Sequence, residues 1–432
     1  MKMKKLTTIL SAGAGLSLVV AGCGQPIPTN NTTPATNQTV TLNSLFMQQA
    51  GYSQQNIEDM TKAFEKFHPN IKVNLTFVPY ESLHDKIVTA LATGGAGYDT
   101  VLTDTIWGPE FSKAGFLMNI TKDIPASVNS DAYQAALNTV SYNGQYFGLP
   151  WIMDTKYFYY NQHMLQQAGI TSQPTTWNQV MSDAKILKQK GIVKYPLDWS
   201  WSQNEALVCD YAALVADFGG QIVNSNGKLV VNQGGAMQAL NFMVNSLKDG
   251  LSNPASTQSV EDDVRKVMSQ GQAAFMLNWT YAYALENDKT QSKVAGQVDV
   301  EPLPGTSTVP YPAPSVNGAM GLAIAQNTKY PVQALEYIDY LSSRQVEEKY
   351  AALSLPFYKS SLKKQTVINT EPAMVKAASV QFNDMINRPS VVKYQTLSQI
   401  LQVQIQKALL GQESPQQAMN NAVSQWNSQQ NQ

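Results

Sequence analysis

The chain has 432 residues, with 30 basic and 31 acidic side chains and a formal net charge of −1 at pH 7. This near-neutral balance argues against nucleic acid or an anionic surface as the main partner, and the length suffices for two ordinary domains. Only 14% of the residues are charged. Much of the polarity therefore comes from uncharged groups whose hydrogen bonding does not change with pH, and an acidic habitat follows as a hypothesis.

The start of the chain predicts export. Three lysines precede an apolar stretch over residues 6–20, and small residues then lead into Cys23. This order is the layout of a secretory signal peptide, and a cysteine after small residues resembles the lipobox of bacterial lipoproteins. We expect residues 1–22 to be removed and Cys23 to carry lipid, on the extracellular face of the cell membrane. The alternative, an uncleaved anchor, is disfavoured because the apolar stretch is short for a hydrocarbon layer of ~30 Å.

A Pro-, Thr- and Asn-rich stretch over residues 25–39 follows the cysteine. It lacks the apolar content that would offset the entropy of ordering, so residues 23–39 are predicted to be a flexible tether. The remaining sequence has no second long apolar run, and no other segment is expected to span the membrane.

Cysteine and histidine are scarce. Cys209 lies alone in an apolar helical run, which favours a small core side chain over a nucleophile. The three histidines, at 68, 84 and 163, do not have metal-ligand spacing with that cysteine. The sequence therefore predicts no intramolecular disulfide, no metal site and no cofactor.

Strands and helices alternate through the first half of the chain, which is typical of an α/β protein. The glycine-rich stretch at 94–97 is no phosphate loop, because it follows a helix and lacks the Lys-Ser/Thr pair. A helix is predicted to begin after Thr176, with Gln179 completing a capping box. The other predicted elements are strands at 40–46, 72–78 and 100–102, helices at 57–67 and 83–92, and a strand pair formed by 145–150 and 157–161 around Asp154.

The second half is predominantly helical. We find no internal repeat and no long linker, so the chain is expected to pass between two domains more than once. The predicted helices are 205–218, 234–249, 261–269, 331–341, 371–386, 397–410 and a last one that begins at Ser414-Pro415, and the predicted strands are 272–277 and 319–325.

Five stretches, taken in order, resemble the extracellular solute-binding proteins of ABC importers, family 1, the maltose-binding-like group and in particular its trehalose/maltose-binding branch. Each stretch alone is mostly hydrophobic packing, but the ordered set is specific. The stretches are YDTVLTDTIWGPEF (98–111), NGQYFGLPWIMDTKYFYYN (143–161), NEALVCDYAALVADFGGQIV (204–223), GQAAFMLNWTYAYAL (271–285) and INRPSVVKYQTLSQILQVQIQKALLGQESPQQAM (386–419).

The resemblance implies a two-lobed α/β periplasmic-binding-protein fold of type II, which closes about a hinge around its ligand. It places the hinge crossings near 153–155, 300–304 and 342–344. Lobe one would comprise residues 38–152 and 305–341, and lobe two residues 156–299 and 345–432.

A neutral sugar presents hydroxyls that donate and accept, and apolar C–H faces, so its receptor needs carboxylates, Arg and aromatic rings. Asp104 ends a predicted strand, Trp279 and Tyr281 follow another, and strand ends are where α/β sheets commonly place ligand groups. Carried over, the resemblance implies Asp104 and Asp154 as hydroxyl acceptors, Trp279 as stacking platform, Tyr281 as second wall and Arg388 as donor. Further candidates are Trp107 and Gly318, with Glu205, Trp151, Trp199 and Trp201 weaker.

Each candidate also has an ordinary structural alternative: a cap for an Asp, a salt bridge for Arg388, core packing for a tryptophan. Two departures from the branch concern pocket size. Ala319 follows Gly318 where a bulky aromatic can stand, and residues 53–56, which include Gln54 and Gln55, offer amides where an acidic contact is expected. A longer or differently linked sugar could fill the extra room.

The sequence thus predicts a lipid-anchored, monomeric receptor that delivers an α-glucoside di- or oligosaccharide to the permease subunits of an ABC importer. One alternative is an anchored glycoside hydrolase, in which Asp104, Asp154 or Glu205 would supply paired carboxylates. Another is a receptor for a non-sugar ligand such as an anion, a peptide or an amino acid. The supply of aromatic residues and the lack of a clustered basic pocket favour sugar.

Overall fold

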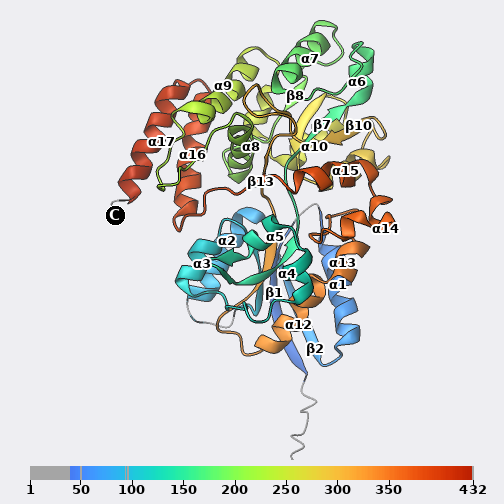
Figure 1. The fold of residues 1–432 in the computed structure, drawn as a ribbon, viewed down its shortest axis with the longest axis vertical. Helices are drawn as coiled ribbons and strands as arrows, with labels where there is room; N and C mark the ends of the chain where they lie inside the picture. Colours follow the sequence, from blue (N-terminus) through green and yellow to red (C-terminus); the bar gives the residue numbers. More distant parts are fainter. Residues whose placement is uncertain (1–38, 49–50, 93, 95–96, 431–432) are drawn as a thin grey trace, which may run out of the picture. The chain divides into compact units, whose positions relative to one another are not determined.

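The computed structural model describes residues 39–48, 51–92, 94 and 97–430. The expected signal peptide, Cys23 and the tether up to residue 38 lie outside the described residues. The described part forms two α/β lobes, each built on its own sheet (Figure 1).

The first lobe surrounds a five-stranded sheet in the order β2-β1-β3-β12-β6. β1 is parallel to β2 and β3, whereas β12 is antiparallel to both β3 and β6. Strands β3, β6 and β12 are buried along their whole length, which explains the nearly continuous apolar sequences of β6 and β12. The strands are β1 (Val40–Met47), β2 (Ile71–Val78), β3 (Thr100–Asp104), β6 (Gly148–Ile152) and β12 (Met320–Ile324), with a small hairpin of β4 (Ser141–Tyr142) and β5 (Gln145–Tyr146).

Helices flank this sheet in the lower part of Figure 1. The first begins at a capping box in which Ser53 accepts from the backbone of Asn56 and Asn56 accepts in return. The helices of the first lobe are α1 (Gln54–Phe67), α2 (Tyr80–Ala92), α3 (Gly108–Ala114), α4 (Ala126–Asp131), α5 (Gln134–Thr139), α12 (Pro331–Leu341), α13 (Arg344–Lys349) and α14 (Gln365–Ile368), with the short 3₁₀ turn η2 (Ser361–Lys363).

The second lobe surrounds a four-stranded sheet in the order β10-β7-β9-β8. Its strands are β7 (Tyr157–Asn161), β8 (Leu197–Asp198), β9 (Phe275–Asn278) and β10 (Val298–Glu301). Its helices are α6 (Gln162–Gln167), α7 (Trp177–Gln189), α8 (Glu205–Asp217), α9 (Gly234–Lys248), α10 (Glu261–Ser269), α11 (Tyr281–Asn287), α15 (Pro372–Gln381), α16 (Tyr394–Leu409) and α17 (Pro415–Gln430), with the 3₁₀ turn η1 (Pro254–Gln258).

The chain first passes between the lobes from β6 to β7, through residues 153–156. The expectation that 145–150 and 157–161 pair with each other is wrong, because the two strands belong to different sheets. β6 pairs with β12, and β7 pairs with β9 and β10.

The second passage lies later than the expected 300–304. Residues 305–314 remain with the second lobe, where the amide of Trp177 donates to the carbonyl of Gly305 at 3.0 Å and Thr306 Oγ1 donates to the carbonyl of Asp217 at 2.9 Å. The chain then crosses at residues 315–319, beginning with β11 (Ser315–Val316), which pairs with β13 (Met385–Ile386). The strand β13 also shows that the predicted helix 371–386 is too long, since α15 ends at Gln381.

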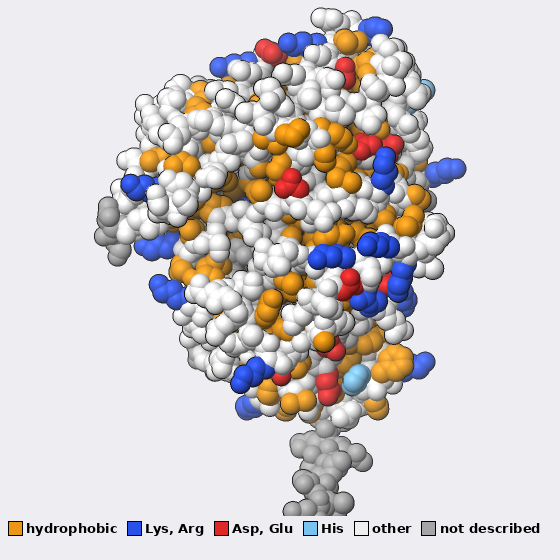
Figure 2. Space-filling model, in the orientation of Figure 1, with side chains coloured by type: hydrophobic (Ala, Val, Ile, Leu, Met, Phe, Trp, Pro, Cys, Tyr) orange, Lys and Arg blue, Asp and Glu red, His pale blue; other side chains and the backbone are white. Residues whose placement is uncertain are grey.

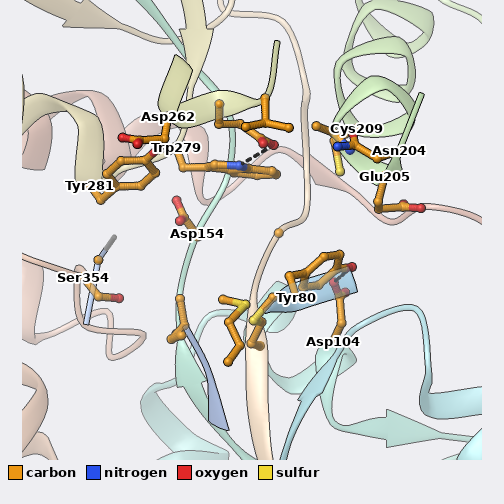
Figure 3. Close-up of a pocket in the computed structure, with 18 of the residues that line it drawn as sticks. Tyr80, Asp104, Asp154, Asn204, Glu205, Cys209, Asp262, Trp279, Tyr281 and Ser354 are labelled. Atoms are coloured by element: carbon orange, nitrogen blue, oxygen red, sulfur yellow. Dashed lines mark hydrogen bonds between the residues drawn. The ribbon is translucent and has the colours of Figure 1, made fainter. Parts of the chain in front are cut away.

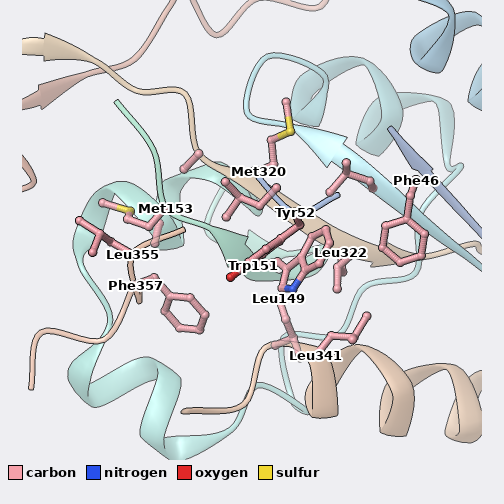
Figure 4. Packing of buried hydrophobic residues seen from close by; sticks show 14 of the residues in the cluster. Phe46, Tyr52, Leu149, Trp151, Met153, Met320, Leu322, Leu341, Leu355 and Phe357 are labelled. Atoms are coloured by element: carbon pink, nitrogen blue, oxygen red, sulfur yellow. The ribbon is translucent and has the colours of Figure 1, made fainter. Parts of the chain in front are cut away.

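The third passage is also later than expected, because residues 342–344 do not leave the first lobe. Arg344 forms an ion pair with Asp131 at 2.8 Å, and the amide of Lys359 donates to the Asp131 carbonyl at 2.8 Å. The chain reaches the second lobe only with α15, where the amide of Leu303 donates to Gln381 Oε1 at 3.0 Å. Apolar residues of 345–368, among them Leu355, pack into the core of the first lobe and hold this segment there (Figure 4).

Large aromatic side chains fill both cores. In the first lobe Trp151 lies with its ring centroid 5.4 Å from Phe46 and 5.0 Å from Tyr52 (Figure 4). In the second lobe Trp199 and Trp201 stack at 5.3 Å. Cys209 is also buried, in α8. Packed rings of this kind contribute both buried apolar area and ring-specific contacts.

Uncharged groups cover most of the face shown in Figure 2, as the 14% of charged residues leads one to expect. Among the described residues, none of the helices combines the length and apolar character needed to cross a bilayer.

Candidate functional site

A cavity of about 280 Å³ lies between the two lobes, with lining residues from both. Seven of the nine ligand-contact candidates from the sequence line it: Asp104, Asp154, Glu205, Trp279, Tyr281, Gly318 and Arg388. The structure thus gathers residues that are up to 284 positions apart in the chain.

Trp107 and Trp151 do not line the cavity, which corrects the expectation for both. Trp107 is 1% exposed and packs against Tyr80 and Phe111 in the first lobe. Trp151 is fully buried because β6 is covered on both of its faces. The weaker candidates Trp199 and Trp201 are core residues too. All four tryptophans pack in the cores, and the sequence alone does not distinguish such core residues from a tryptophan that contacts a ligand.

Trp279 differs from the other six tryptophans, which are all fully buried. It directly follows β9, is half-buried, and forms the wall above Asp154 in Figure 3. Its indole Nε1 donates to Glu261 Oε1 at 3.0 Å, and its backbone carbonyl accepts from Tyr159 at 2.7 Å. The ring is therefore held at its edge and its base, leaving a face toward the cavity.

Asp154 lies below the Trp279 ring, on the first passage between the lobes (Figure 3). Its Oδ1 accepts from the amide of Thr155 at 2.9 Å, the amide of Thr280 at 3.0 Å and Thr280 Oγ1 at 2.6 Å. The other oxygen, Oδ2, has no hydrogen-bond partner among the described residues. Burial raises the pKa of this carboxyl to about 6, against the opposing effect of the Thr280 hydrogen bonds. One oxygen is thus free to accept from a ligand.

Asp104, Arg388 and Glu205 form a buried bridge across the lobes. Arg388 Nη2 contacts Asp104 Oδ1 at 2.8 Å, and Nη1 contacts Glu205 Oε1 at 2.6 Å. Asp104 ends β3 of the first lobe, whereas Glu205 opens α8 of the second, where the helix N-terminus favours a carboxylate.

The remaining oxygens of the bridge are also engaged. Tyr80 donates to Asp104 Oδ2 at 2.7 Å, and Ser398 donates to Glu205 Oε2 at 2.5 Å. In this conformation both carboxylates bind Arg388, and because they come from different lobes, the arginine links the two lobes. They are not open acceptors, and neither is placed as a free acid or base.

Sequence reasoning missed several lining residues. Tyr80 and Glu81 open α2, Glu261 and Asp262 open α10, and Ser354 follows α13. The only sequence signal at the carboxylates Glu81, Glu261 and Asp262 is the start of a helix, where such residues ordinarily serve the helix itself.

Glu261 is the most informative of these residues. Its Oε1 accepts from both Trp279 and Lys156, while Oε2 has no hydrogen-bond partner among the described residues. It is therefore both a support for the indole and a second open acceptor.

The two departures that suggested a wider pocket lie elsewhere. Ala319 is 1% exposed, belongs to the first-lobe core and does not line the cavity, whose wall there is formed by Met320. Gln54 and Gln55 are exposed and donate to Glu58 and Asp59 along their own helix. Neither substitution adds room to the cavity.

Six carboxylate residues and one cation, Arg388, line the cavity. The described residues contain no group of three or more His, Cys, Asp or Glu side chains arranged to hold a metal ion. Cys209 contributes to the wall, and burial raises the pKa of its thiol, so it remains protonated. The cavity therefore offers a ligand carboxylate oxygens that accept hydrogen bonds, next to the aromatic ring of Trp279.

Comparison with known proteins places the fold. Residues 50–348 match the sequence profile of a family described as bacterial extracellular solute-binding protein. A probable ABC transporter-binding protein of Deinococcus radiodurans is 28% identical over 360 residues, covering 79% of this chain and 83% of that protein. An arabinooligosaccharide-binding protein of Bacillus subtilis is 23% identical over 316 residues, covering 70% of this chain and 68% of that protein.

Among solved structures, the maltose-bound MalE3 of T. maritima matches with a TM-score of 0.82 at 27% identity, covering 89% of this chain and 98% of that one. This similarity confirms the two-lobed, maltose-binding-like fold expected from the sequence.

Proposed function

Because this chain belongs to the bacterial extracellular solute-binding protein family, whose members are receptors and not enzymes, we propose that it binds an α-glucoside di- or oligosaccharide of the trehalose or maltose kind and delivers it to an ABC importer. In this proposal the sugar occupies the cavity between the lobes. Its binding in the closed conformation draws the lobes together, since closure needs a ligand that contacts both.

The observation that carries the proposal is the Trp279 platform. A half-buried indole faces a cavity that is also lined by Asp154 and Glu261, each of which has a free oxygen. Glu261 accepts from the indole Nε1, and Asp154 accepts from the amide of Thr280, the residue after the tryptophan. A pyranose can place its C–H face on the ring while its hydroxyls donate to those oxygens. Charge-assisted hydrogen bonds of this kind are stronger than neutral ones.

Two further observations support a short glucoside. The cavity of about 280 Å³ is near the lower end of the ~300–1,000 Å³ common for ligand sites, which favours a ligand of few rings. The solved structure described above holds maltose. A relative named for arabinooligosaccharides shows that family members differ in their sugar.

We also propose that Cys23 is the lipid attachment site and that residues 23–39 tether the receptor to the outer face of the membrane. The support for this part is the order of basic, apolar and small residues before the cysteine. We expect the receptor to act as a monomer beside its permease.

A thermal-shift panel tests the ligand proposal. Maltose, trehalose and maltotriose are compared with arabinobiose, mannitol, ribitol and glutamate, each at the same high concentration. A ligand present at 100 times its Kd stabilises the folded state by ~2.7 kcal/mol, so a true ligand raises Tm clearly. The proposal predicts the largest rise for an α-linked glucose disaccharide or trisaccharide, and it is overturned if only polyols, arabinosides or amino acids raise Tm.

A further inference from the structure

Lys156 is a buried cation immediately beyond the first passage between the lobes. It is fully buried, and its Nζ lies 3.0 Å from Asp210 Oδ1, 3.2 Å from Glu261 Oε1 and 3.2 Å from Ser200 Oγ. It does not line the cavity, so a direct contact with the ligand does not explain its position.

The ammonium of Lys156 also lies over the indole of Trp279, 4.5 Å from the ring centroid. Trp279 lines the cavity and Lys156 does not, so the ammonium contacts the platform from outside the ligand space. This is cation–π geometry in a desolvated place, where the attraction is strongest.

Glu261 completes the arrangement. One oxygen of Glu261 accepts from both Lys156 Nζ and the indole N–H of Trp279. Lys156 therefore holds Glu261 in place, and Glu261 in turn holds the edge of the ring. The ring is thereby held by the cation over one face and by the carboxylate at its edge.

We infer that Lys156 is a positioning residue that sets the orientation of the Trp279 stacking platform, through the cation–π contact and through Glu261. The inference rests on the proposed function insofar as the platform receives a sugar. It assigns a role in ligand affinity to a residue that the ligand does not touch.

Energetics favours this interpretation over simple stabilisation. Buried ion pairs stabilise a fold little, because desolvation opposes their attraction, and apolar residues of similar volume often do as well. An apolar side chain at 156 would fill the space but would leave Glu261 without its cation and the ring without the cation over its face.

The backbone of the same segment links the passages between the lobes. Ser315 Oγ donates to the carbonyl of Lys156 at 2.7 Å, and Thr155 Oγ1 donates to the carbonyl of Val316 at 2.7 Å. The backbone of Lys156 is therefore fixed at the point where two passages between the lobes are hydrogen-bonded to each other. This fixes the position of its ammonium, and so of the ring, relative to both lobes.

The test uses the Lys156→Met/Asp210→Asn double variant, which removes the cation and one opposing buried charge together. Lys194→Met is the matched control: its ammonium lies 5.0 Å from the Tyr195 ring centroid, and neither residue lines the cavity. Sugar affinity is measured by calorimetry with the best ligand of the panel. Ring accessibility is measured without ligand by acrylamide quenching, which reports mainly on Trp279 because the other six tryptophans are fully buried.

We expect the double variant to bind about tenfold more weakly and to show altered quenching, while the control matches the parent. Glu261→Gln, which keeps an acceptor for the indole but loses the charge paired with Lys156, should fall between them. Parent-like quenching and parent-like affinity in a folded double variant overturn the inference. If the double variant does not fold, parent-like quenching and affinity in Glu261→Gln overturn it instead. Quenching needs no sugar, so failure of the ligand proposal leaves this part of the test intact.

Discussion

Gly318 lies against the six-membered ring of the Trp279 indole, so closely that a Cβ at position 318 would be 2.4 Å from Cζ3. The amide of Gly318 donates to the carbonyl of Asp154 at 3.0 Å, which prevents its backbone from moving away. The glycine is thus part of the platform's geometry, because any side chain there displaces the ring.

Gly318→Ala is expected to weaken sugar binding by tenfold or more, by tilting the indole, with a smaller loss of stability. Gly108→Ala is the control, since a Cβ at 108 meets nothing within 4 Å. Titration calorimetry compares the two; equal affinities would show that the ring does not need its present position.

Trp279→Ala should mainly weaken sugar binding, whereas Trp426→Ala should mainly reduce stability. Trp279 faces the cavity, and its loss should weaken binding by roughly tenfold to a hundredfold. Trp426 is fully buried in α17, so its loss should reduce the free energy of unfolding by ~3–5 kcal/mol and leave affinity near that of the parent. Calorimetry and urea unfolding measure both quantities, and parent-like binding by folded Trp279→Ala would mean that the site lies elsewhere.

Arg388→Met should be strongly destabilising, because Asp104 and Glu205 then remain buried without their cation. The expected loss is ~3–5 kcal/mol in the free energy of unfolding. Arg344→Met removes a partly exposed pair with Asp131 and should cost at most ~1 kcal/mol. Urea titration of both variants checks the difference; similar small losses would show that the cross-lobe bridge is not an energetic link.

Stability should rise on mild acidification. Burial raises the pKa of Asp154 to about 6 and those of Asp198 and Glu286 to about 7, above the ordinary carboxyl values of 3.8 to 4.5. At pH values between the ordinary and the raised pKa of each group, the folded state keeps a proton on that carboxyl which the unfolded chain has released. The free energy of unfolding therefore increases as pH falls from about 7 toward about 4.5.

The trend should reverse below that range. There, groups such as Glu413, whose pKa is lowered by its hydrogen bond from Lys407, become protonated and lose their stabilising interactions. Urea unfolding at a series of pH values measures the curve, with Asp154→Asn as the variant that should flatten part of it. A steady decline from neutral pH would contradict both this prediction and the acid-habitat hypothesis.

Cys23→Ser should release the protein into the soluble fraction without changing sugar affinity. Acyl chains contribute ~0.8 kcal/mol per buried methylene to membrane binding, and the serine cannot carry them. Fractionation followed by calorimetry on the released protein is the measurement, and a cleaved variant that stays with the membrane would argue against the lipobox.

Much of the fold followed from local pattern. The capping box at Thr176 and Gln179 is present as predicted, and the helix over 205–218 differs from α8 by a single residue at its end. Such features depend on residues close in sequence, so periodicity and capping chemistry suffice to find them. The family and the two-lobed architecture followed from an ordered set of motifs.

The passages between lobes could not be placed in this way. Residues 305–314 and 345–368 have no local property that assigns them to one lobe. Their positions are decided by long-range contacts, such as Trp177 with Gly305 and Arg344 with Asp131. Sequence pattern carries no information about partners this far apart.

The same division holds for the site. Asp154 and Trp279 could be proposed from the sequence, because carboxylates and aromatic rings are the chemistry that a sugar requires and the family resemblance implied both positions. Both residues line the cavity. Only the tertiary structure decided which of seven tryptophans keeps a face in the cavity, and that Asp104 and Glu205 are occupied by Arg388. Burial and pairing are properties of the packed chain: the same Trp or Asp becomes core, bridge or ligand contact according to the neighbours that folding brings to it.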